Sequence, residues 1–168
     1  YQKRLKSYGS ANIKISLLVA GVIIIFATLI YTQILVTEIL GREREIANLY
    51  AKSIEFLATD ESQSGEYNFV FETVISSNSI NFPIVVTDAK SGAPTFLKNI
   101  TVDSTLSKEM QTALIKEMVS EMDEVNPPIK VSFGDSIILS YVHYGQSDLV
   151  MRLKTFPIFQ FIVAGIFI

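Results

Sequence analysis

Few side chains in this sequence could carry out nucleophilic, acid–base or metal chemistry. The 168 residues include one histidine, His143, and no cysteine, so neither a two-histidine metal site nor a thiolate site can form. Several aspartates fall in separate predicted loops, without the spacing of a calcium-binding loop: Asp88, Asp103, Asp135 and Asp148. A glycine-rich phosphate loop and a Gly-x-Ser-x-Gly nucleophile elbow are also missing. We therefore expect no catalytic residue, no metal and no cofactor in this segment.

One group of polar and aromatic residues is compatible with ligand binding. Tyr141 and His143 alternate along a predicted strand and therefore share one face of the sheet. Lys98 and Asn99 lie at the end of a neighbouring predicted strand. If a small ligand is bound, we expect its pocket at these four residues. For His143 itself the favoured interpretation is a structural or surface role, and ligand contact or pH sensing are the alternatives, because histidine titrates near neutral pH.

These residues lie beyond a long segment that contains no charge. The 22 residues from Ile15 to Val36 would form a helix roughly 33 Å long, enough for the roughly 30 Å hydrocarbon core of a bilayer. A cleaved signal peptide is the alternative, but its apolar region is only about 7 to 15 residues long and ends at a small-residue cleavage site. We predict a transmembrane helix over 15–36, with the lipid bilayer as its partner.

The charges on the two sides of this segment predict its orientation. Four basic residues and no acidic residue precede it: Lys3, Arg4, Lys6 and Lys14. The positive-inside rule therefore places the tail 1–14 in the cytoplasm. Residues 37–155 carry ten basic and 17 acidic side chains, which is common for an extracytoplasmic domain. This acidic balance also argues against nucleic acid as a partner.

The helix is predicted to continue outward as a rod over 37–59, because no proline interrupts it. Apolar residues recur along it at spacings of three, four or seven and form one stripe. Two interpretations of this stripe remain open, packing against its own domain and pairing in a homodimer. The residues assigned to the dimer interface are Ile39, Ile46, Tyr50, Ile54 and Leu57.

A small α+β domain is predicted over 60–145. A short helix within 66–78 precedes a first hairpin, in which NFPIVVTD and TFLKNI flank a turn at Gly92 and Pro94. An amphipathic helix then ends before Pro127, and its apolar stripe comprises Met110, Leu114, Met118 and Met122. A second hairpin is predicted with a two-residue turn that pairs Phe133 with Ser136. This pairing places Val131 and Val142 on one face, and Tyr141 and His143 on the other.

A connector helix is predicted over 146–155, with Ser147 as its N-cap. The apolar run 156–168 is too short to span a bilayer and still continues at Ile168. We interpret it as the start of a second transmembrane helix, so the natural protein is expected to continue.

The sequence resembles the sensor half of membrane histidine kinases of the Bacteroidota type. The similarity covers nearly the whole chain, including LGREREIANLYAKSIEFLA, FPIVVTD, EMDEVNPPIKV and YVHYGQSDLVMRLKTFPIFQ. Its most distinctive parts are NPPI at Asn126–Ile129 and YG-x-S-x-L at Tyr144–Leu149. The resemblance implies a PAS-like periplasmic domain between two spans of the bacterial inner membrane. It also implies a cytoplasmic phosphorylated-histidine helix and an ATP-binding domain beyond Ile168.

The expected function is therefore extracytoplasmic sensing and transmembrane signalling in a two-component sensor histidine kinase. The stimulus would be a small molecule or a protein. His143 would lie on the wrong side of the membrane to be the phosphate acceptor, so this segment would not itself be an enzyme. A membrane-anchored binding or scaffold protein without catalytic activity is the alternative.

Overall fold

The structure is a computed structural model that describes residues 5–58, 80–133 and 137–167. The chain divides into two compact units, and each is described by itself. The first combines Tyr1–Glu38 with Arg152–Ile168, and the second is Ile39–Met151. The short helix predicted within 66–78 lies outside the described residues.

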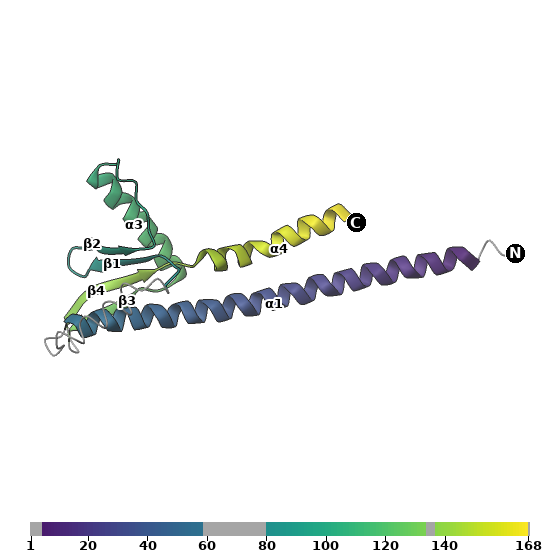
Figure 1. The fold of residues 1–168 in the computed structure, drawn as a ribbon, viewed down its shortest axis with the longest axis horizontal. Helices are drawn as coiled ribbons and strands as arrows, with labels where there is room; N and C mark the ends of the chain where they lie inside the picture. Colours follow the sequence, from purple (N-terminus) through teal and green to yellow (C-terminus); the bar gives the residue numbers. More distant parts are fainter. Residues whose placement is uncertain (1–4, 59–79, 134–136, 168) are drawn as a thin grey trace. The chain divides into compact units, whose positions relative to one another are not determined.

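Helix α1 extends without interruption from Leu5 to Ala58 (Figure 1), so it includes the predicted span and all but the last residue of the predicted rod. No proline removes a backbone hydrogen bond along its length. Among the residues that the structure describes, α1 is the one helix that is long and apolar enough to cross a membrane. It is therefore the candidate membrane span of this chain.

Helix α4 runs from Asp148 to Phe167 and crosses the predicted boundary between connector and second span. Ser147 Oγ accepts a hydrogen bond from the Val150 amide at 3.4 Å, which confirms the predicted N-cap. Asp148, Arg152 and Lys154 occupy the first half of the helix. The second span accordingly stays a prediction.

A hydrogen bond joins the two helices of the first unit. Gln160 Nε2 donates to Thr28 Oγ1 over 2.6 Å. The Thr28 hydroxyl itself donates to the Ile24 carbonyl at 3.0 Å, a bond within α1. This bond connects residues that are 132 positions apart in the sequence.

The second unit contains a four-stranded antiparallel sheet with strand order β2-β1-β4-β3. Its strands are β1 (Ile84–Asp88), β2 (Pro94–Lys98), β3 (Ile129–Phe133) and β4 (Ile137–Tyr144). The first hairpin turns at Gly92, whose φ of 64° is accessible to glycine without strain. Asp88 Oδ1 accepts from the Ser91 amide at 2.7 Å and closes the same turn. The α+β class and both hairpins were predicted correctly.

The predicted register of the second hairpin is wrong. Phe133 pairs with Ile137 rather than with Ser136, so three residues connect the strands instead of two. The register also shifts between Val131 and Ser132. An irregularity of this kind adds one residue to one strand, which a strict alternation of side chains cannot anticipate. Val131 and Val142 nevertheless share one buried face, as predicted.

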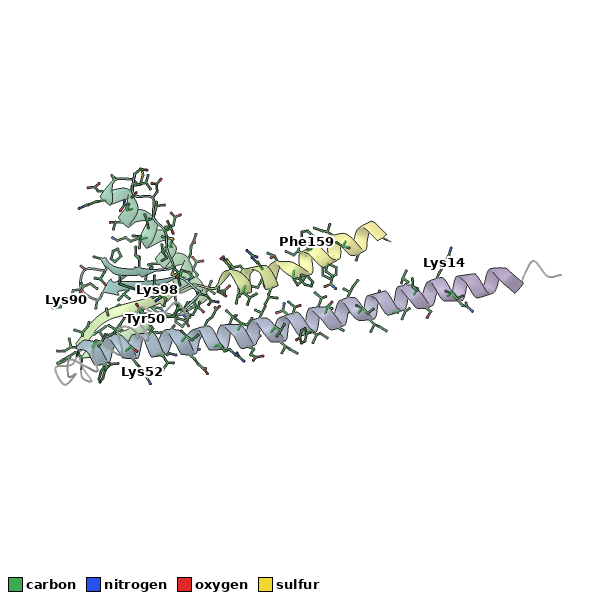
Figure 2. The ribbon with its side chains drawn as sticks, in the orientation of Figure 1. Lys14, Tyr50, Lys52, Lys90, Lys98 and Phe159 are labelled. Atoms are coloured by element: carbon green, nitrogen blue, oxygen red, sulfur yellow. The ribbon has the colours of Figure 1, made fainter. Side chains whose placement is uncertain are left out.

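Each face of the sheet is covered by a helix of the same unit (Figure 1). On the first face, Ala47, Tyr50 and Ala51 of α1 pack against strand residues such as Ile84 and Val142. Tyr50 is 1% exposed and points from α1 toward the sheet, whereas Lys52 is exposed and points away (Figure 2). The C-terminal part of α1 is therefore an integral part of the domain core.

Helix α3 (Lys108–Val125) covers the second face. Ser107 caps its first turn by accepting from the Met110 amide, and Asn126 ends it before Pro127. Its buried residues are Ile115 and Met122, whereas Met110 and Leu114 are exposed. The predicted methionine stripe is thus wrong at its N-terminal end. Steps of four residues advance about 40° around a helix, so a long i,i+4 series rotates away from any one face.

Candidate functional site

His143 forms a buried hydrogen-bonded bridge between the sheet and α3. The residue lies on β4 and is 6% exposed. Its Nδ1 lies 2.6 Å from Asp123 Oδ1 on α3, and its Nε2 lies 2.9 Å from Thr87 Oγ1 on β1. Because the carboxylate accepts, Nδ1 carries a proton and the Thr87 hydroxyl donates to Nε2 when the ring is neutral. Both ring nitrogens are therefore used within the domain.

The other residues of the predicted ligand site fall in two places. Tyr141 lies half-buried on the same face as His143, with its ring centroid 6.4 Å from the imidazole. Lys98 ends β2, where burial lowers the pKa of its ammonium group. Asn99 follows with a φ of 55° and donates through Nδ2 to the carbonyls of Ile80 and Phe82. Asn99 therefore holds the segment that leads into β1.

A cavity of about 450 Å³ lies beyond one end of the sheet. Ile84 pairs with Lys98 on one side and with Tyr144 on the other, so the start of β1 and the ends of β2 and β4 lie at this end of the sheet. The residues just outside these strands line the cavity together with the C-terminal half of α3 and the first turn of α4. They include Pro83, Asn99, Met118, Glu121, Gln146 and Met151.

The cavity includes one of the four predicted ligand residues. Asn99 lines it, whereas Tyr141, His143 and Lys98 do not. The face that carries Tyr141 and His143 is covered by α3, through the apolar contacts of Ile115 and Met122 with Val85 and through the Asp123–His143 bridge. The four predicted ligand residues did not include a methionine, whereas Met118, Met122 and Met151 line the cavity.

Gly145 brings two parts of this site unusually close together. A Cβ atom at this position would lie 2.7 Å from Pro83 Cγ, closer than real Cβ atoms approach a neighbour. The Gly145 amide donates to the Pro83 carbonyl over 2.9 Å. Glycine is therefore required here for the close approach of β4 to the segment before β1.

A buried carboxylate connects α1 to the start of α4. Glu43 is 4% exposed, and its Oε1 accepts from the Ser147 amide at 3.3 Å. Its Oε2 is buried without a hydrogen-bond partner. Ser147 is 2% exposed and caps α4, so the negative charge lies at the positive end of that helix. The pKa of the nearby Tyr144 hydroxyl is raised, mainly because the group is buried. The positive charge of Arg44 opposes this shift, and the negative charge of Glu43 adds to it.

The stripe that was assigned to the dimer interface packs within its own chain. Tyr50 belongs to the domain core, and Ile46, Ile54 and Leu57 pack against that core. Ile39 is half-buried at the start of the second unit. These side chains therefore pack on the domain itself, as the first of the two interpretations predicts, and the pairing of two copies stays a prediction. The face of α1 that remains exposed in this unit includes Leu49 and Phe56.

Within the described ranges, no three histidine, cysteine, aspartate or glutamate side chains are placed to hold a metal ion. Comparison with known proteins adds no further assignment, because no family model, no curated protein and no solved structure matches the chain.

Proposed function

We propose that this chain is the sensing and transmembrane signalling module of a two-component sensor histidine kinase. The observation that carries the proposal is the continuity of α1. One helix supplies both the candidate membrane span and, through Ala47, Tyr50 and Ala51, part of the domain core. A change of packing in the domain therefore acts on the same continuous helix that contains the apolar segment.

The contact between Glu43 and Ser147 supports the same function. Through it the domain end of α1 holds the N-terminus of α4, the helix that leads to the second predicted span. A stimulus that favours one arrangement of this contact over another would shift the two helices relative to each other. Such a stimulus must bind the two states with different affinity, and a tenfold difference corresponds to about 1.4 kcal/mol.

The remaining parts of the proposal follow the resemblance and the charge pattern. The sheet domain would be PAS-like and periplasmic, with residues 1–14 in the cytoplasm and α1 in the inner membrane. The module would act as a homodimer, and the kinase and ATP-binding domains would follow residue 168. In this assignment the module itself catalyses no reaction.

Two measurements on the natural full-length protein test the proposal. In membrane vesicles supplied with radiolabelled ATP, we expect phosphate on a histidine, labile to acid and stable to base. Glu43→Ala should change the labelling by about fivefold or more, within the usual range for coupling between sites. Glu45→Ala is the matched control, since Glu45 is an exposed carboxylate on the same helix. Its labelling should be unchanged.

The absence of histidine phosphorylation in a protein that is expressed and inserted would contradict the kinase assignment. The chain would then be better described as a membrane-anchored binding or scaffold protein. Equal labelling of wild type and Glu43→Ala would instead contradict the role of the Glu43 contact in signalling.

A further inference from the structure

We propose that the cavity at the end of the sheet binds a small, largely apolar organic cation. The volume of about 450 Å³ falls within the roughly 300 to 1,000 Å³ that small-molecule sites usually occupy. The inference rests on the proposed function only for what the ligand does to signalling. Binding itself is a property of the domain.

Methionine side chains dominate the apolar lining. The chain has four methionines, and three of them line this cavity, Met118 and Met122 on α3 and Met151 on α4. Ile100 and Val125 add further apolar surface. Thioether side chains are flexible and polarizable, so they adapt to ligands of irregular shape and make favourable contacts with aromatic rings. The lining therefore favours an apolar body, including an aromatic one.

The charge of the ligand follows from Glu121. This carboxylate is the one charged side chain among the residues that line the cavity. Lysine and arginine are absent from that lining set, which otherwise offers neutral polar groups such as Asn99 and Thr101. A cationic group beside Glu121 is attracted, whereas an anion would face the carboxylate without a compensating base. The lining therefore selects a cation over an anion of the same shape.

The cavity is lined by residues of both α3 and α4, so a bound ligand can affect the position of α4. Met118 and Glu121 belong to α3, whereas Met151 lies in the first turn of α4. The Met151 amide donates to the Ser147 carbonyl over 3.1 Å, so this lining residue is bonded directly to the cap of α4. A ligand that contacts both helices favours the arrangement in which both line the cavity. Occupancy would thus be reported to α4 close to the Glu43 contact.

The methyl groups of the methionines allow ligand binding to be measured by NMR. The full chain, labelled with ¹³C at the methionine methyl groups and held in detergent, should give four methyl signals. The probe is phenyltrimethylammonium, and its control is benzenesulfonate, a phenyl ring with a tetrahedral head of opposite charge. We expect the cation to shift the signals of Met118, Met122 and Met151 with a dissociation constant on the order of 1 mM. Met110, exposed and outside the cavity lining, should not shift.

A pair of charge variants on the same helix completes the test. Glu121→Gln should weaken binding of the cation by about two- to fivefold, as expected for one solvent-exposed charge. Glu117→Gln should leave it unchanged, because Glu117 is exposed on α3 and does not line the cavity. Equal weakening by both variants would show a general effect of net charge and would overturn the assignment.

Three further outcomes would overturn the proposed cation site. They are equal signal shifts with the cation and the sulfonate, shifts of Met110 as large as those of the other three methionines, and no shifts at all. These outcomes are separate from the fate of the proposed function. If the cation does not bind but histidine phosphorylation occurs, the cation site is wrong and the kinase assignment is unaffected. Binding without any phosphorylation would keep the cation site and remove the kinase assignment.

Discussion

At the scale of single residues, Tyr50 makes the stability of the domain depend on pH under alkaline conditions. The side chain is 1% exposed, and burial raises the pKa of its hydroxyl to about 12. In the unfolded chain the pKa of a tyrosine hydroxyl is about 10. The stability contributed by the protonated Tyr50 is therefore fully present below pH 10, and it is lost as the pH rises through about 12. A shift of about two pKa units sets an upper limit of about 3 kcal/mol, which solvent screening reduces.

We therefore expect the free energy of unfolding to fall between pH 10 and 12 in denaturant titrations of the full chain. Tyr50→Phe should remove this part of the decrease, because phenylalanine keeps the ring and has no proton to lose. Tyr141→Phe, at a half-buried strand position, should retain it. An identical decrease in wild type and Tyr50→Phe would contradict the prediction.

The bridge from Asp123 to His143 is a second prediction at this scale. Asp123→Asn replaces the carboxylate that accepts from the buried imidazole. We expect the free energy of unfolding to fall by about 0.5 to 1.5 kcal/mol, because the amide oxygen still accepts from the imidazole but lacks the charge that strengthens the bond. Chemical denaturation measures the difference. Glu124→Gln is the control, since the neighbouring carboxylate is exposed and should change the stability by less than about 0.5 kcal/mol.

At the scale of elements, two glycines should respond to alanine with opposite signs. Gly145→Ala places a methyl group against Pro83 Cγ and should destabilise the domain by about 1 to 3 kcal/mol. Gly41→Ala has open space around its Cβ on α1 and should stabilise the helix by about 0.4 to 1 kcal/mol. The denaturation midpoints of the two variants test both signs. A stable Gly145→Ala variant would show that β4 and Pro83 can separate.

At the scale of the whole molecule, the topology is predicted by the basic tail and the candidate span. A reporter that is active only outside the cytoplasm should give signal when fused at position 65 and none at position 1. The reverse pattern would overturn the periplasmic assignment of the domain. Low signal at both positions, with the fusion proteins present in membranes, would argue against a single crossing between them.

The proposed homodimer makes a separate prediction at the same scale. Because Tyr50 and Ala47 are buried in their own domain, two rods must meet through the face that includes Leu49 and Phe56. In this cysteine-free chain, Leu49→Cys and Phe56→Cys should cross-link between copies in membranes. Asn48→Cys is a third exposed position. Comparing its cross-linking yield with the yields at Leu49 and Phe56 shows whether the contact is specific to one face of the helix. Ala47→Cys should not cross-link.

The sequence alone determined those features that depend on local order. An uncharged run without proline predicts a long helix, and α1 forms one over the expected span and rod. Turn residues between β-branched runs predict hairpins, and both hairpins form. A serine before an amphipathic segment predicts a cap, as at Ser147. In each case the residues that predict the feature lie close together in the sequence.

The tertiary structure decided the contacts that join distant segments. The sequence left two uses of the α1 stripe open, because an apolar stripe packs equally well on a sheet or on a second helix. It placed a ligand site at Tyr141 and His143, but α3 covers that face through Asp123. The cavity instead depends on segments 83, 99–101, 118–125 and 145–151 meeting at one end of the sheet. Long-range packing, which no local pattern encodes, sets which residues meet there.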